Sequence, residues 1–210
     1  MIATQRSPID LAYVQHIRKV VLLALVLASI AAVVLGESRW PGGTTAHEAT
    51  EWAGLALIVF CILGRTWSSL YIGGRKVHSL VTTGPYSVSR NPLYVFSIIG
   101  AAGVGAQFGS VIAALAAGFA AWLVFHLVVL KEERVLTEKF GNTYRRYLAE
   151  VPRFFPRFSL WRDVAFIEVK PRDVLRTFVD ATVFLIAIPI VEGFEYLHEL
   201  GALPVLFHLP

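Results

Sequence analysis

The chain is poor in charged residues and nearly devoid of cysteine. Cys61 is its single cysteine in 210 residues, so no disulfide can form within the chain. Charged residues make up 16% of the sequence, against roughly 25% in an average soluble domain, and 56% of residues are hydrophobic. The mean hydropathy is +0.62. These values exclude an ordinary soluble domain and predict an all-α, polytopic helical membrane protein.

Apolar runs of about 20 residues are long enough for one helix each to cross a hydrocarbon core of roughly 30 Å. We therefore expect one membrane domain over residues 1–210, with about five transmembrane helices. The last run contains Asp180, Glu192 and Glu195, but Lys and Arg are absent from Thr177 onward, which favours a fifth span kinked at Pro189. The expected spans are residues 20–36, 52–71, 92–107, 110–130 and 177–200.

The apolar run at residues 20–36 follows basic residues, as the apolar part of a signal peptide does. The run is longer than the usual roughly 7–15 residues, and no convincing small-x-small cleavage site follows it. We interpret it as a retained first helix.

Positive charge is distributed asymmetrically along the chain. With a cytoplasmic N-terminus, the cytoplasmic segments are residues 1–19, 72–91 and 131–176, and they hold 17 of the 19 Lys and Arg residues. The positive-inside rule then places both polar clusters described below in the cytoplasm. We expect an integral protein of a bacterial inner membrane whose basic loops, rather than a nucleic-acid partner, explain the net charge of +4.

The third and fourth apolar runs are rich in Gly and Ala, which allows two helices to pack closely as a hairpin. Pro92 suits the first turn of the third helix, where no backbone N–H is needed. Arg65, near the end of the second run, either snorkels to the interface or faces a polar cavity.

The first polar cluster precedes this hairpin. Gly84 and Pro85 predict a turn, and Arg90 and Asn91 then stand at a helix N-terminus. Unpaired N–H groups there favour a carboxylate or phosphate, which Arg90 can also bind. The alternative is a charged loop in which Arg90 anchors the membrane headgroup region.

The second polar cluster follows the hairpin. Glu132 and Glu133 stand at the negative end of a helix, where a carboxylate needs a cationic partner. His126 lies two turns before Glu133 on the same face, and it is either a site residue or a buried, hydrogen-bonded histidine. No second His or Cys lies near it in the sequence, so no metal site is predicted.

A short amphipathic helix is expected next. Gly141 ends the preceding helix, and Asn142 is expected to cap the new one. Tyr144 and Tyr147 share one face of it, while the adjacent arginines 145 and 146 point elsewhere, toward anionic headgroups.

Together the two clusters form the pattern G-P-Y, R-x-P-x-Y, an apolar hairpin, E-E-x-x-L-x-x-x-F-G-x-x-Y-x-x-Y and V-P-R-x-x-P. This pattern resembles the isoprenylcysteine carboxyl methyltransferase family and the related phospholipid methyltransferases. The resemblance covers residues 75–157, the expected methyltransferase core. The matching residues are Gly84, Pro85, Tyr86, Arg90, Pro92, Tyr94, Glu132, Glu133, Leu136, Phe140, Gly141, Tyr144, Tyr147, Pro152, Arg153 and Pro156.

The resemblance implies S-adenosylmethionine as methyl donor, S-adenosylhomocysteine as product and a lipophilic or membrane-associated acceptor reached from the lipid side. Arg90 is assigned to the cofactor carboxylate, Glu132 or Glu133 to its amine or ribose, and Arg153 to an anionic substrate group. Catalytic candidates are Glu133, Arg90 and Arg153. Cofactor-binding candidates are His78, Gly84, Tyr86, Arg90, Asn91, Pro92, Tyr94, His126, Glu132, Glu133, Tyr144 and Tyr147.

Two features depart from the family. Asn91 stands where the family commonly has histidine, so an amide or a neighbour such as His78 must make that contact. The chain also has two expected helices before the motif, fewer than eukaryotic members, so the substrate channel differs. The acceptor is either a carboxylate, which is already nucleophilic, or an amine or thiol, for which Glu133 or His126 would take the proton.

Two alternatives belong to other classes. Membrane sterol reductases resemble this group in their C-terminal half and use NADPH, although they are larger. A non-enzymatic membrane adaptor would explain the basic loops but not the recurring Arg, Glu and Tyr pattern.

Overall fold

The structure is a computed structural model that describes residues 36–38, 40, 43–72, 80–203, 205 and 207–209. The predicted first span at residues 20–36 lies outside this part of the chain, except for Gly36, which begins a strand. His78 also lies outside the described residues.

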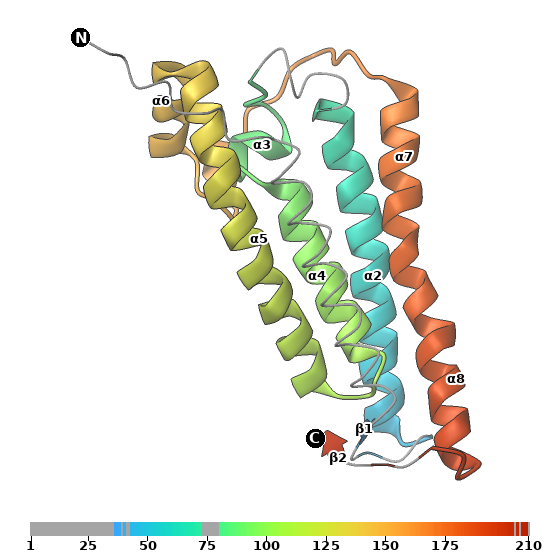
Figure 1. The fold of residues 1–210 in the computed structure, drawn as a ribbon. Helices are drawn as coiled ribbons and strands as arrows, with labels where there is room; N and C mark the ends of the chain where they lie inside the picture. The colour runs from blue at the N-terminus through green and yellow to red at the C-terminus, as the bar shows by residue number, and fades with distance from the viewer. Residues whose placement is uncertain are drawn as a thin grey trace, which may run out of the picture.

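Three helical segments of the described chain are long and apolar enough to cross a membrane. A fourth apolar helix is shorter, and Figure 1 shows all four side by side in the order α5, α4, α2 and α7–α8. They overlap the second to fifth predicted spans and confirm the predicted helical membrane class. The segments are α2 (Thr45–Ile72), α4 (Pro92–Ala106), α5 (Val111–Phe140) and the run formed by α7 (Pro171–Thr182), η2 (Val183–Ile186) and α8 (Ala187–Glu199).

The short elements gather at the two ends of this layer (Figure 1). At one end lie α3 (Pro85–Val88), α6 (Asn142–Glu150) and η1 (Phe158–Leu160). At the other end β1 (Gly36–Ser38) pairs in parallel with β2 (Phe207–Leu209).

Local signals explain the boundaries of α4 and α5. Pro92 opens α4 as predicted, and the Ser110 side chain caps α5 by accepting a hydrogen bond from the Ala113 N–H at 3.2 Å. Gly141 ends α5 with a φ of 55°, a conformation that glycine adopts without strain. Gly141 is also the N-cap of α6, so the prediction that Asn142 caps this helix is wrong.

Three helices extend beyond the predicted spans. The second predicted span began at residue 52, whereas α2 begins at Thr45. The fourth predicted span ended at residue 130, but α5 continues to Phe140 and carries the acidic pair on its last turns. The fifth predicted span began at residue 177, whereas α7 begins at Pro171. The 3₁₀ segment η2 interrupts the last helix just before Pro189. Proline lacks the N–H that would bond the carbonyl four residues earlier, which favours this interruption.

Small residues bring the helices close together. A Cβ added at Gly103 on α4 would lie 2.7 Å from the carbonyl oxygen of Gly54 on α2, and one added at Gly54 would lie 2.7 Å from the carbonyl oxygen of Gly103. A Cβ at Gly105 would lie 2.8 Å from the Cα of Ala114 on α5, which confirms the predicted hairpin of α4 and α5. Backbone contact of this kind is typical of membrane helices.

This packing predicts that Gly103→Ala destabilises the protein. The added methyl would overlap the α2 backbone, and overpacking of this kind costs about 1–3 kcal/mol. Gly193→Ala on α8 is the matched control, because its Cβ meets no described atom within 4 Å and replacing a helical glycine gains up to about 1 kcal/mol. Thermal unfolding of the detergent-solubilised chain should show a lower midpoint only for Gly103→Ala. An equal or higher midpoint for that variant would contradict the close packing.

Candidate functional site

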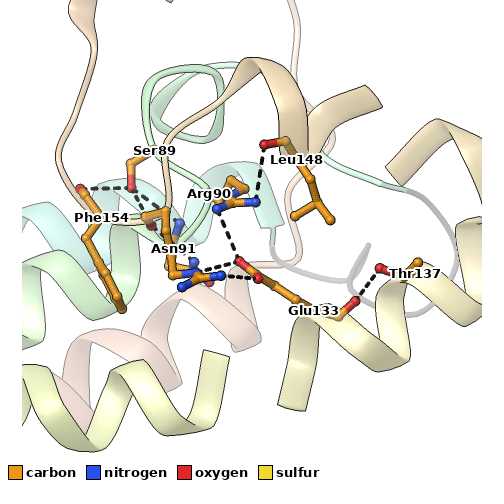
Figure 2. Close-up of polar contacts among 8 residues, drawn as sticks. Ser89, Arg90, Asn91, Glu133, Thr137, Leu148 and Phe154 are labelled. Atoms are coloured by element: carbon orange, nitrogen blue, oxygen red, sulfur yellow. Dashed lines mark hydrogen bonds and ion pairs between the residues drawn. The ribbon is translucent and has the colours of Figure 1, made fainter. Parts of the chain in front are cut away.

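A buried ion cluster joins the two predicted polar clusters (Figure 2). Glu133, on α5, is 9% exposed, and its Oε1 and Oε2 accept hydrogen bonds from Arg153 Nε at 3.0 Å and Nη2 at 2.8 Å. Arg90 Nη2 lies 3.4 Å from Glu133 Oε1. The carboxylate therefore has the cationic partners that its place at the negative end of α5 requires. Hydrogen bonding to Glu133 raises the pKa of Arg153, which keeps its guanidinium charged.

Backbone hydrogen bonds hold the two arginines beside this carboxylate. The Arg90 N–H donates to the Pro152 carbonyl at 2.9 Å, and the Arg157 N–H donates to the Val88 carbonyl at 3.0 Å. The segment after α6 thus runs along the loop between α3 and α4. These two hydrogen bonds hold the backbone segment that carries Arg90 beside the segment that carries Arg153.

Two side chains in the same loop reinforce the pairing. Asn91 Nδ2 donates to the Arg153 carbonyl at 3.1 Å, and Ser89 Oγ donates to the Phe154 carbonyl at 3.2 Å (Figure 2 labels Ser89, Asn91 and Phe154). Asn91 therefore positions the backbone of an arginine that binds Glu133. The Asn91 amide thus makes a contact at the position where the isoprenylcysteine methyltransferase pattern commonly has histidine.

Glu132 points to a different partner from its neighbour. The Tyr94 hydroxyl, on α4, donates to Glu132 Oε1 at 2.8 Å. The Tyr94 ring stacks on Phe125 with centroids 4.6 Å apart. The two acidic residues therefore have different partners: Glu132 binds a tyrosine, and Glu133 binds two arginines.

Tyr86, on α3, supplies a buried donor. Its side chain is 5% exposed, and its hydroxyl has no hydrogen-bond partner among the described residues. Burial raises the pKa of Tyr86 well above its usual value, with smaller contributions from Tyr147, Tyr94 and Glu132, so the hydroxyl stays protonated. The Nε–H of Arg90 is another buried donor, and it has no hydrogen-bond partner among the described residues.

The helix α6 packs its tyrosines inward, as predicted. Tyr144 and Tyr147 are 3% and 7% exposed, whereas Arg145 and Arg146 are exposed. Burial raises the pKa of both phenols. The Tyr147 hydroxyl donates to the Tyr86 carbonyl at 2.7 Å, which ties α6 to α3.

His126 faces aromatic rings. Its ring centroid lies 5.4 Å from that of Trp122 and 6.1 Å from that of Phe154. Its Nδ1 is buried and finds no hydrogen-bond partner in the described structure, so the alternative of a hydrogen-bonded histidine does not hold for this atom. Arg65 turns inward, because its Nη1 donates to Ser97 Oγ on α4.

The segment that follows the recognised motif was not predicted to contact the site. The Gly84 N–H, at a φ of 59°, donates to the Arg162 carbonyl at 2.7 Å, and the Arg162 N–H donates to Ser87 Oγ at 3.0 Å. The Tyr71 hydroxyl donates to Asp163 Oδ1 at 3.0 Å. These residues lie beyond the V-P-R-x-x-P pattern, and no sequence signal marked them.

Comparison with known proteins gives the family. The phospholipid methyltransferase family matches residues 49–143. The cobalt-zinc-cadmium resistance protein CzcN of Cupriavidus metallidurans is 38% identical over 87% of this chain and 82% of its own length. The nickel-cobalt-cadmium resistance protein NccN of Alcaligenes xylosoxydans xylosoxydans is 33% identical over 97% of this chain and 94% of its own length.

A protein-S-isoprenylcysteine O-methyltransferase of Schizosaccharomyces pombe is 33% identical over 44% of this chain and 40% of its own length. No solved structure matches. The match to the phospholipid methyltransferase family includes both Arg90 and Glu133. The chain belongs to the same family as CzcN and NccN, and its residues 49–143 are similar to the phospholipid methyltransferases.

Proposed function

We propose that the chain transfers a methyl group from S-adenosylmethionine to a lipophilic acceptor, with the site on the cytoplasmic face of the membrane. The observation that carries this proposal is the cluster of Arg90, Glu133 and the partly exposed Arg153, which joins the two halves of the methyltransferase pattern. Glu133 lies on the last turns of α5, just after the apolar run of this helix ends at Leu130, and α6 follows at this end of the bundle (Figure 1). An acceptor with a lipid tail would meet the site at this boundary.

The residues present fit the cofactor. The buried, unpartnered donors Tyr86 O–H and Arg90 Nε–H suit a carboxylate, which accepts hydrogen bonds and donates none. The aromatic faces of Tyr86, Tyr94 and Tyr144 suit a cationic sulfur or an adenine ring. When bound, S-adenosylmethionine supplies an electrophilic methyl group, and no metal is needed for its displacement.

The chain's own contribution is positioning and charge. Two guanidinium groups share one carboxylate, so the cluster of Arg90, Arg153 and Glu133 has a net charge of about +1 by formal count. This excess charge would orient an anionic group of the cofactor or acceptor. Glu132, which accepts from Tyr94, is the candidate for the cofactor's amine. Alignment of the reacting groups can supply much of the rate enhancement.

The identity of the acceptor decides whether a base is needed. Both oxygens of Glu133 already accept hydrogen bonds from Arg153. In this proposal Glu133 therefore positions the arginines and does not take a proton from the acceptor. A carboxylate acceptor needs no deprotonation. For an amine acceptor, His126 is the proton acceptor that we propose, because its buried Nδ1 has no partner among the described residues.

Glu133→Gln should lower methyl transfer in membranes at least about tenfold. The substitution removes the negative charge that Arg90 and Arg153 share, and breaking a buried ion pair costs about 3–5 kcal/mol. A loss of about 1.4 kcal/mol of this in the transition state is enough to lower the rate tenfold. Glu138→Gln, one turn later on the exposed side of α5, is the matched control and should keep the wild-type rate. Near wild-type rates for both Glu133→Gln and Arg90→Ala would refute the site.

Calorimetric titration of the purified chain with S-adenosylhomocysteine and with NADP distinguishes the proposal from its alternatives. Binding of S-adenosylhomocysteine alone is expected. Binding of NADP would favour a reductase, and binding of neither would favour an adaptor.

Tyr86→Phe should weaken S-adenosylhomocysteine binding without destabilising the ligand-free protein. An unpaired buried hydroxyl costs about 1–3 kcal/mol, so its removal should leave the unfolding midpoint unchanged or higher. Tyr147→Phe is the matched control, because it deletes the hydrogen bond to the Tyr86 carbonyl and should lower the midpoint. If Tyr86→Phe binds S-adenosylhomocysteine as tightly as the wild type, its hydroxyl is not a cofactor contact.

We also propose that this methyl transfer contributes to resistance against divalent transition-metal ions. Support comes from the two relatives that match nearly the full chain, both of which are named as metal resistance proteins. A cobalt-sensitive host expressing the wild-type chain should tolerate more cobalt than one expressing Glu133→Gln at equal protein level. Equal tolerance would separate resistance from the methyl-transfer site.

A further inference from the structure

A second cluster of ionisable side chains lies at the opposite end of the bundle from Glu133. His47 and Glu51 stand in the first two turns of α2, and Glu195 comes from α8, at the end where α2 begins and α8 finishes (Figure 1). His47 Nε2 lies 3.2 Å from Glu51 Oε1 and 3.7 Å from Glu195 Oε1. The two carboxylates and one imidazole therefore converge from two helices that are far apart in the sequence.

The orientation of the imidazole leaves one nitrogen for this cluster. His47 Nδ1 lies 3.2 Å from the Trp40 carbonyl oxygen. Because a carbonyl only accepts, Nδ1 carries the hydrogen. Nε2 then faces two carboxylates and must hold a proton or a metal cation between them. A backbone carbonyl behind the other ring nitrogen is the usual outer contact of a metal-binding histidine.

The distances between the donor atoms fit a transition metal. Ligands that bind tetrahedral zinc at about 2.0–2.2 Å lie roughly 3.3–3.6 Å from one another. The two contacts of His47 Nε2, 3.2 Å and 3.7 Å, bracket this range. One donor atom from each of the three residues lies within 4.8 Å of the other two, so a small movement of the carboxylates would complete the arrangement.

The surrounding structure holds the cluster in place. His47 is 4% exposed, and Gly109, in the turn between α4 and α5, packs against its ring. Gln107 Nε2 donates to the Glu51 carbonyl at 3.0 Å. Glu195 lies near the C-terminal end of α8, where the helix dipole disfavours a carboxylate and favours a cation.

We propose that His47, Glu51 and Glu195 bind one divalent transition-metal ion of the zinc class. Imidazole with carboxylate suits Zn²⁺ or Co²⁺, whereas Mg²⁺ and Ca²⁺ prefer oxygen ligands alone. This site differs from the sequence-based expectation that the chain binds no metal. Its residues come from α2 and α8, whereas the Arg90–Glu133–Arg153 cluster involves α5, so the metal site does not rest on the proposed methyl transfer.

The test is metal titration of the full chain, purified in detergent without a histidine tag and stripped with a chelator. Calorimetry with Zn²⁺ and visible absorption with Co²⁺ should each report a saturable site at one ion per chain. Glu195→Gln should weaken Zn²⁺ affinity by more than the 10–100-fold that loss of an outer contact costs. His47→Ala should do the same, and excess Mg²⁺ should not compete.

Glu48→Gln is the matched control, because Glu48 is an exposed carboxylate of the same first turn of α2. It should bind Zn²⁺ as the wild type does. The near-isosteric Glu195→Gln keeps the test valid if His47→Ala fails to fold. Wild-type protein that binds no more Zn²⁺ than Glu195→Gln would overturn the proposal and leave His47 as a structural contact between α2 and α8.

Discussion

A buried carboxylate at the negative end of a helix is stable only with cationic partners, and Glu133 has two. Arg90 precedes the α4–α5 hairpin and Arg153 follows α6, so this one side chain holds together segments from three parts of the chain. Removal of Glu133 would leave two guanidinium groups without their shared carboxylate in a largely buried place, which is strongly destabilising. The loop before α4 and the segment after α6 therefore depend on the same interaction.

Close backbone packing makes this cluster possible. Gly54 and Gly103 let α2 and α4 touch, and Gly105 does the same for α4 and α5. Helices that approach this closely place the start of α4 beside the end of α5, where Tyr94 reaches Glu132. In lipid no hydrophobic force distinguishes one helix from its surroundings, so shape fit and polar contacts must define the arrangement.

The sequence predicted what local chemistry decides. Pro92, Ser110 and Gly141 mark helix boundaries through their own backbone preferences, and the spacing of Tyr144 and Tyr147 gave the buried face of α6. The family pattern named Glu133 and Arg153, but not that they bind each other. Contacts between distant segments left no local signal. The hydrogen bond of Arg65 to Ser97, that of Arg162 to Ser87, and the contact of Glu195 with His47 all depend on how the helices assemble.

The two ionic clusters solve one physical problem at opposite ends of the bundle. Apolar side chains and small residues allow membrane helices to pack, but they resist sliding along their axes only weakly. Glu133 fixes the C-terminal end of α5 against the segments before α4 and after α6. The contact of His47 with Glu195 fixes α2 against α8. The first cluster has an excess of cations and the second an excess of carboxylates. Each end is thus suited to a ligand of the opposite charge, an anionic group at one and a metal cation at the other.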